Sequence, residues 1–159
     1  MKIKAKLKSL TPNTEICAFV SNDNELLVIN VSVLKLKLKN KSALGILPVV
    51  ADTAKYYISS GIVDMEAIPL QKVDRIFEPV IAIHEPNGST LIDGKHRYCA
   101  AALYAEHMGI AATLQAHALS VDDARKFDVK AAMKSKLKLD EDGLRGFLTY
   151  SGYLSSGEA

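Results

Sequence analysis

The sequence has few cysteines, no long apolar run and no strong excess of charge of one sign. Its 159 residues contain two cysteines, Cys17 and Cys99, which lie far apart and lack the paired spacing of a zinc site. This excludes a disulfide framework and a zinc ribbon, and reduced thiols in a cytoplasm are expected. No window is apolar over the length that spans a bilayer, so neither membrane insertion nor a classical export signal is expected.

The net charge of +2 neither requires nor excludes a nucleic-acid partner, so any such partner must be argued from local charge placement. With 48% hydrophobic and 24% charged residues, the composition is that of a folded globular protein. A chain of this length forms one compact domain, and residues 1–159 are expected to form it.

The first part of the chain shows two alternating patterns. Lysines alternate with apolar side chains over Lys2–Lys8 and again over Val33–Lys39, which predicts two half-buried strands. Between these patterns, apolar runs at 17–20 and 25–31 flank the turn formers at 21–24, which predicts a hairpin. Residues 1–47 are thus expected to be rich in β-structure, and they match no family.

Patterns after Pro48 predict helices and strands in turn. A helix is expected to end near Ser60, strands are expected before and after the turn at 85–88, and a helix is expected over 95–108 with Gly109 as its stop. A strand at 115–119, a helix that starts at Ser120 and runs to Ala132, and a short helix after Asp140 complete the prediction. The expected fold class is α+β, with a small mixed β-sheet flanked by helices.

The segment Leu91–Ala100 is the clearest candidate for a functional site. An apolar strand leads through Gly94 into a helix whose first turn carries Lys95, His96 and Arg97. Free backbone N–H groups, the positive end of a helix and cationic side chains together form an anion site. Gly94 lets a phosphate approach the backbone, Arg97 offers a planar fork to its oxygens, and Lys95 adds a mobile charge.

Asp93 needs its own explanation, because a carboxylate beside a phosphate is repulsive. We expect Asp93 to cap the helix, with coordination of magnesium as the second option. The bland alternative is a capped turn in which Lys95, His96 and Arg97 are merely solvated, and the chemistry of the residues alone leaves these alternatives balanced.

The same turn resembles the signature of the ParB/sulfiredoxin-like superfamily, in which Gly-x-His/Arg-Arg begins a helix that runs into small residues. The resemblance extends from Glu78 through the turn and its helix to the segment 115–124. It marks residues 78–135 as a nucleotide-binding core, which covers under half of the chain. The matching positions are Gly94, His96, Arg97, Tyr98 and Ala101.

The resemblance implies that the turn binds the triphosphate of ATP or CTP, with Gly94, Lys95, His96 and Arg97 at the phosphates. Members of the family include plasmid and chromosome partition factors, sulfiredoxins, free-serine kinases and DNA nucleases, so the fold does not fix the activity. Lys95 stands where a sulfiredoxin has its nucleophilic cysteine, and the chain lacks room for the further domains of a partition factor. A stand-alone nucleotide-binding domain remains.

Three residues are the catalytic candidates for an NTP hydrolase or phosphotransferase. His96 and Asp93 lie in the turn, and Glu78 is the carboxylate before it that merits an early test as a general base. A small-molecule kinase like the free-serine branch would also need an acceptor pocket. Self-association into a homo-oligomer stays open.

The alternative function is a DNA-binding or nuclease-type protein of plasmids or phages. It would use the same basic turn together with Lys35, Lys37 and Lys39 on a phosphate backbone. Against it, edge lysines also prevent strand aggregation, and aromatic residues are not interleaved with these lysines as single-strand stacking prefers. Likewise His84, His107 and His117 form no compact metal motif with His96.

Overall fold

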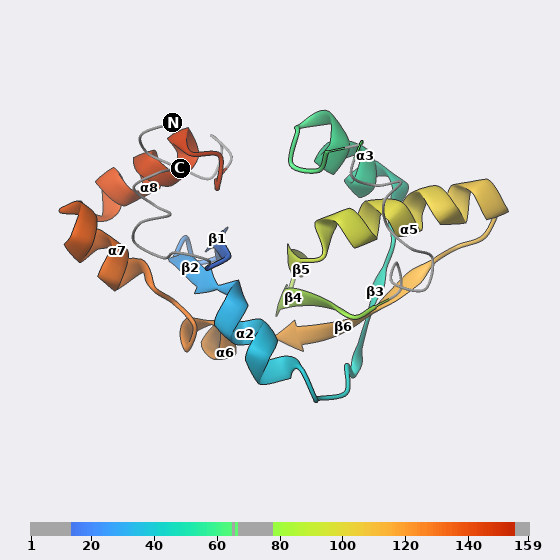
Figure 1. The fold of residues 1–159 in the computed structure, drawn as a ribbon, viewed down its shortest axis with the longest axis horizontal. Helices are drawn as coiled ribbons and strands as arrows, with labels where there is room; N and C mark the ends of the chain where they lie inside the picture. Colours follow the sequence, from blue (N-terminus) through green and yellow to red (C-terminus); the bar gives the residue numbers. More distant parts are fainter. Residues whose placement is uncertain (1–13, 65, 67–77, 155–159) are drawn as a thin grey trace. The chain divides into compact units, whose positions relative to one another are not determined.

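The computed structural model describes residues 14–64, 66 and 78–154 (Figure 1). Their contacts form two compact units, which we describe separately. The first unit contains the described residues 14–40, 85–87 and 120–154, and the second contains 41–64, 66, 78–84 and 88–119. The α+β class is confirmed, with two small sheets in place of the single sheet predicted. The single domain over residues 1–159 stays a prediction.

The first unit contains the predicted hairpin. Strands β1 (Ile16–Val20) and β2 (Leu26–Asn30) pair in antiparallel register. The turn closes through the Asn24 N–H, which donates to the Ser21 carbonyl at 2.9 Å, and Asn24 has a φ of 62°. Asn tolerates this left-handed conformation better than most residues, which explains its place at the turn.

The lysine-bearing run after the hairpin is a helix, so the predicted strand at 33–39 is wrong. Helix α2 (Val31–Leu38) is capped by Asn30, whose side chain accepts a hydrogen bond from the Val33 N–H at 3.1 Å. Val31 and Leu34 are buried on one face of this helix. A capping Asn and apolar residues three positions apart are helix signals, and they outweigh the alternation of Leu and Lys.

Three helices at the end of the chain complete the first unit. They are α6 (Val121–Arg125), α7 (Lys130–Leu137) and α8 (Glu141–Tyr150). The Ser120 side chain caps α6 by accepting from the Asp123 N–H, as predicted, and Asp140 caps α8 in the same way. The prediction of one continuous helix from Ser120 to Ala132 is wrong, because this segment contains two helices, α6 and the first part of α7.

The break between α6 and α7 follows from hydrogen bonds to β2. The Asp128 carboxylate accepts from the Val28 N–H at 2.9 Å, and the Val129 N–H donates to the Val28 carbonyl at 2.8 Å. One residue before Asp128, the Phe127 carbonyl accepts from the Asn30 N–H at 2.8 Å. These bonds satisfy backbone groups of β2 that a continuous helix could not reach.

A hydrophobic core joins the hairpin to the last two helices. Met133, Leu144 and Leu148 pack on buried residues of both strands, so side chains more than 100 positions apart share one core. Burial of this kind removes apolar surface from water and is the main stabilising contribution to folding. The buried members are Ile16, Leu26, Val28, Met133, Leu144, Leu148 and Leu154.

The second unit is built on a mixed four-stranded sheet with the order β3-β6-β4-β5. β3 (Gly45–Pro48) is antiparallel to β6 (Thr113–Leu119), and β4 (Val80–Glu85) is parallel to β6. The turn at 86–87 joins β4 to β5 (Gly88–Asp93). The strands predicted around this turn and at 115–119 are therefore confirmed, with β6 starting two residues earlier.

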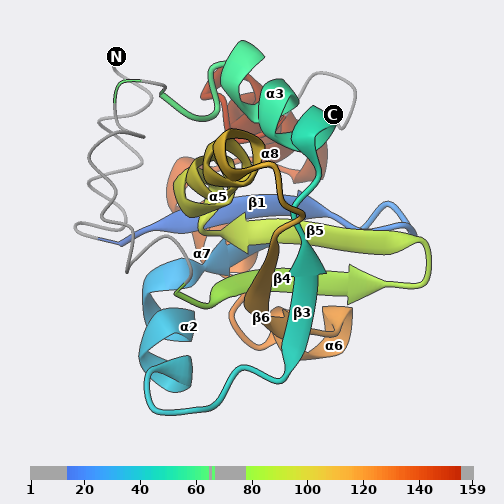
Figure 2. The same ribbon diagram turned by 90° about the vertical axis from the view of Figure 1, so that its right-hand side faces the viewer.

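Helices α3 (Ala51–Ser59) and α5 (Lys95–Met108) lie side by side on one face of this sheet (Figures 1 and 2). Gly61 and Gly109 follow the two helices with φ values of 79° and 64°, so both predicted helix ends are confirmed. Alanines at the contact allow the two backbones to approach closely. The shared core contains Ala54, Val63, Val80, Leu91, Tyr98, Cys99, Ala100, Ala101, Leu114 and Ala116.

Two further sequence predictions concern the N-terminal segment and membrane insertion. The strand predicted over Lys2–Lys8 lies outside the described residues. Among the helices that the structure describes, none combines the length and the apolar character needed to cross a membrane.

Candidate functional site

The turn between β5 and α5 is built around Gly94. β5 ends at Asp93 and α5 begins at Lys95, as the sequence predicts, and Gly94 is the N-cap residue with a φ of 102°. Glycine adopts this left-handed backbone without the strain that a Cβ would introduce. Within the described part of the chain, no side chain caps this helix end. The N–H groups of the first turn have no acceptor within the helix, as at any helix N-terminus.

Close packing gives Gly94 a second role. A Cβ at this position would lie 2.5 Å from Val80 Cγ1 and 3.0 Å from the Arg97 side chain. The sequence suggested that Gly94 gives a phosphate room to approach, whereas here the space on the Cβ side is filled by β4. The glycine therefore brings the turn against Val80, the first residue of β4. A ligand would have to approach the turn from another side than the one that a Cβ would occupy.

Arg97 is held by two carboxylates and a carbonyl. Its Nη1 donates to the Pro79 carbonyl at 2.9 Å, and its Nη2 donates to Asp93 Oδ2 at 3.0 Å. Glu78 Oε2 lies 3.9 Å from Nη1. Three predicted site residues, Glu78, Asp93 and Arg97, thus meet at one point, where Arg97 joins the first turn of α5 to the start of β4.

The prediction that Asp93 caps α5 is wrong. Gly94 occupies the N-cap position, so Asp93 lies one residue too early for its side chain to serve the N–H groups of the first turn. The Asp93 side chain is only 9% exposed, and a carboxylate this deeply buried requires a charged or hydrogen-bonding partner. Arg97, four positions along the chain, is that partner.

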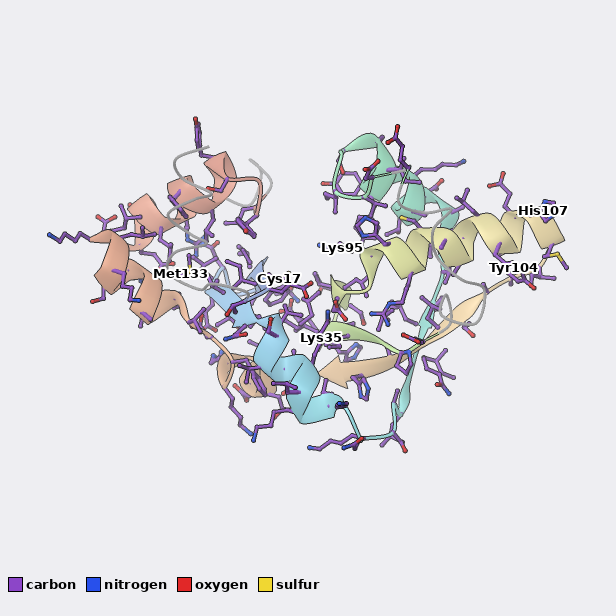
Figure 3. All side chains as sticks on the ribbon, in the orientation of Figure 1. Cys17, Lys35, Lys95, Tyr104, His107 and Met133 are labelled. Atoms are coloured by element: carbon purple, nitrogen blue, oxygen red, sulfur yellow. The ribbon has the colours of Figure 1, made fainter. Side chains whose placement is uncertain are left out.

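The ion pair decides how charge is arranged at the turn. Because Arg97 is engaged by Asp93, a phosphate reaches the guanidinium only by sharing it with a carboxylate or displacing one. Lys95 and His96 are the other cationic or titratable side chains of the first turn, and both are partly exposed. Lys95 lies at the start of α5 (Figure 3), and its Nζ is 5.8 Å from the centroid of the Tyr57 ring on α3.

A pocket of about 270 Å³ is lined by residues of β3, α3, β5 and α5. Its wall contains Tyr57, over which Lys95 lies, and Tyr98 from the fourth position of α5. Sequence reasoning did not find the pocket, because its residues come from four separate segments. Its lining consists of Leu47, Pro48, Val50, Thr53, Tyr57, Ser89, Leu91 and Tyr98.

Tyr98 fixes the wall of the pocket. Its hydroxyl accepts a hydrogen bond from the Val50 N–H at 2.7 Å and donates to the Pro48 carbonyl at 3.3 Å. Its ring meets that of Tyr57 edge to face, with the centroids 5.8 Å apart. The family resemblance marked Tyr98 as a matching position without giving it a role. In the structure, this buried tyrosine joins α5 to the segment that enters α3.

Cys99 is a packing residue. Its side chain is fully buried in the core between α3 and α5, and its Sγ lies 3.7 Å from the Ala54 carbonyl. Burial raises the pKa of the thiol to about 11, so the nucleophilic thiolate is suppressed at neutral pH. The sequence-based interpretation of Cys99 as a small buried residue is confirmed.

The residues at the turn do not fit a magnesium ion held by the protein. Within the described residues, no group of three or more His, Cys, Asp or Glu side chains is placed to hold a metal. Asp93, the predicted ligand, is already paired with Arg97. His84 is hydrogen-bonded with Ser89, and His107 lies at the far end of α5 from Lys95 (Figure 3). Magnesium bound together with a nucleotide stays a prediction.

The three lysines of the DNA-binding alternative do not form the predicted stripe. On a helix, Lys35 and Lys39 share a face, whereas Lys37 lies on the opposite side. Lys35 also forms an ion pair with Glu15 at 2.9 Å. The strand geometry behind this alternative is therefore wrong, although DNA binding itself stays a prediction.

Comparisons with known proteins add no relative. No protein-family model, no curated protein and no solved structure matches the chain. The resemblance to the ParB/sulfiredoxin-like superfamily therefore stays a prediction carried by the residues of the turn. The function has to be argued from the geometry of the turn and its surroundings.

Proposed function

We propose that the protein binds a nucleoside triphosphate at the N-terminal turn of α5. The observation that carries the proposal is the helix end itself, where Gly94 caps the helix with its backbone alone. Lys95 and His96 stand in the first turn, beside N–H groups that no side chain caps within the described residues. Backbone donors, the helix dipole and a cationic side chain are complementary to phosphate oxygens.

Arg97 has a different role in this proposal from Lys95. Its two hydrogen bonds to Pro79 and Asp93 fix the start of α5 against β4, so that the N–H groups are held in place before a ligand arrives. Preorganisation of this kind lowers the entropic cost of binding. Arg97 contacts phosphate only where it shares its guanidinium with Asp93.

Binding is tested by calorimetry with ATP and with CTP, each with and without magnesium. Lys95→Gln removes one charged contact and should weaken binding by about ten- to a hundredfold, since a charge-assisted hydrogen bond contributes roughly 1.5–3 kcal/mol. The matched control is Lys55→Gln, an exposed lysine on α3 that should leave affinity unchanged. If the unmodified protein binds neither nucleotide, the proposal is wrong.

Hydrolysis or transfer is the finer part of the proposal. Glu78 is 47% exposed and lies beside Arg97, so its carboxylate can accept a proton from water or from an acceptor hydroxyl at the turn. Release of phosphate or of nucleoside diphosphate should fall strongly in Glu78→Gln. It should persist in Glu106→Gln, which changes an exposed glutamate farther along α5. Equal turnover in both variants would exclude Glu78 as the base.

A further inference from the structure

The pocket beside the turn has a distinct chemical character. Among the residues that the structure describes, the eight that line the pocket carry no charge. Tyr57 and Tyr98 give it aromatic walls, Leu47 and Leu91 are aliphatic, and Thr53 and Ser89 supply hydroxyl groups. A lining of this type takes a flat, mainly apolar group and fixes its orientation with a few hydrogen bonds.

Charge decides which part of a ligand the pocket accepts. A zwitterionic acceptor such as an amino acid would lose hydration at both charges and find no ionic partner among the lining residues. A neutral heteroaromatic ring has no such cost. Lys95 Nζ is 5.8 Å from the Tyr57 ring, so an anionic substituent on a ligand in the pocket would extend toward the turn.

The size of the pocket agrees with a part of a nucleotide. Pockets for whole small ligands usually have volumes of about 300–1,000 Å³. This one, at about 270 Å³, holds a base but not its phosphates as well. Two residues connect the pocket to the turn at the start of α5. Tyr57 lines the pocket and lies under Lys95, and Tyr98 lines the pocket and belongs to the first part of α5.

We propose that this pocket is the base subsite of the nucleotide site, with the base against the partly exposed Tyr57 and the phosphates at the start of α5. The inference rests on the proposed function. The Tyr98 hydroxyl is hydrogen-bonded on both sides to the Pro48–Val50 segment, which fixes this wall of the pocket. A preformed aromatic wall binds a base with little ordering cost.

The test compares a nucleotide with tripolyphosphate, which carries the phosphates and lacks the base. The unmodified protein should bind ATP or CTP at least about tenfold more tightly than tripolyphosphate, the gain expected from a base stacked on aromatic side chains. Thr53→Phe fills the pocket from α3 and should bring nucleotide affinity down to that of tripolyphosphate. Ser59→Phe is the control, an exposed position on the same helix outside the pocket.

A second pair of variants approaches from the sheet. Ser89→Phe fills the pocket from β5, and Thr90→Phe places the same ring on the opposite face of that strand. Circular dichroism checks that each variant folds, so that a misfolded Thr53→Phe does not prevent the test. Only the pocket-filling member of each pair should lose the preference for nucleotide.

The outcomes separate the two proposals. Equal affinity of the unmodified protein for nucleotide and tripolyphosphate, or an unchanged preference in folded Thr53→Phe and Ser89→Phe, would overturn the base subsite and leave the phosphate turn standing. Failure of both ligands to bind the unmodified protein would overturn the proposed function and the subsite with it.

Discussion

At the scale of single residues, Gly94 meets two requirements at once. Its φ of 102° favours glycine, and its missing Cβ is what allows Val80 to pack against the turn. Either requirement alone would make substitution costly. Because both act at the cap of α5, the position of the candidate phosphate site depends on this glycine.

Replacing Gly94 with alanine should destabilise the protein by about 2–4 kcal/mol, from backbone strain and from the clash with Val80. Urea denaturation followed by circular dichroism measures the change. Gly109→Ala is the matched control, because Gly109 also has a positive φ but its Cβ would meet nothing within 4 Å. Its expected loss is about 1 kcal/mol. Equal losses in the two variants would contradict the packing role of Val80.

The two cysteines should differ in reactivity. Burial places the pKa of Cys99 near 11, so its thiolate reaches one half only at about that pH, whereas Cys17 is partly exposed on β1. Iodoacetamide at about pH 8 should modify Cys17 and leave Cys99 intact in the native protein. Peptide mass spectrometry identifies the modified residue. Modification of both thiols before unfolding would show that the core around Cys99 opens.

How far single site residues could be predicted depends on how local their contacts are. The turn at 93–95 and the burial of Cys99 follow from neighbouring residues, through glycine conformation and the apolar helix around the thiol. The pairing of Asp93 with Arg97 depends on which residue takes the N-cap position, a one-residue shift that the sequence does not fix. The contact of Arg97 with Pro79 needs β4 beside the turn, which only tertiary structure provides.

At the scale of elements, α2 shows how a two-residue alternation can mislead. Leu and Lys alternate as in a strand, but the capping Asn30 and the burial of Val31 and Leu34 follow helical spacing. Both patterns are present in the same eight residues. Packing of two apolar side chains on one face decides between them, because that face is the one removed from water.

The end of α7 offers a stabilising substitution. Lys138 is the C-cap residue with a φ of 56°, a conformation that glycine adopts without strain. Lys138→Gly should raise the free energy of unfolding by about 0.5–1 kcal/mol. Lys136→Gly, at an exposed position inside the same helix, should instead lower it by about 1 kcal/mol. Thermal denaturation compares the two variants, and a loss at both positions would contradict the strain at Lys138.

At the scale of the molecule, ion pairs connect distant parts of the first unit. Arg125 at the end of α6 binds Glu25 in the hairpin, and Glu141 on α8 binds Lys134 on α7. Hydrogen bonds from Arg125 and from Lys134 hold the pKa values of Glu25 and Glu141 below their ordinary value of 4.5. Arg145 adds a link from α8 to the Asn24 carbonyl at 2.6 Å.

Stability should therefore fall in acid. A carboxylate with a lowered pKa in the folded state stabilises the protein above its unfolded pKa, and this contribution is lost as the pH falls through the folded value. The free energy of unfolding should thus be smaller at about pH 4 than at about pH 7. Glu25→Gln/Glu141→Gln should be less stable at neutral pH and show a smaller drop, in urea titrations at both values. If the double variant lost as much stability between pH 7 and pH 4 as the unmodified protein, these ion pairs would not be the cause of the loss. Glu106→Gln is the control, and its loss should equal that of the unmodified protein.

The overall class could be predicted from the sequence, whereas the division into two units could not. Helix stops at Gly61 and Gly109 and helix starts at Ser120 and Asp140 are local signals, and each marks one end of a helix. The break at 126–129 exists because the backbone there bonds to β2, about 100 residues away. A pairing this distant leaves no trace in local periodicity.

The core that unites the hairpin with α7 and α8 also sets an order of events during synthesis. Leu26 and Val28 leave the ribosome more than 100 residues before Met133, Leu144 and Leu148, the side chains that bury them. The second unit emerges whole in the interval, since its residues lie between 41 and 119. The nascent chain therefore carries an apolar hairpin that lacks these partners until residues 133–148 have emerged, and in that interval the hairpin is a target for chaperones and for aggregation.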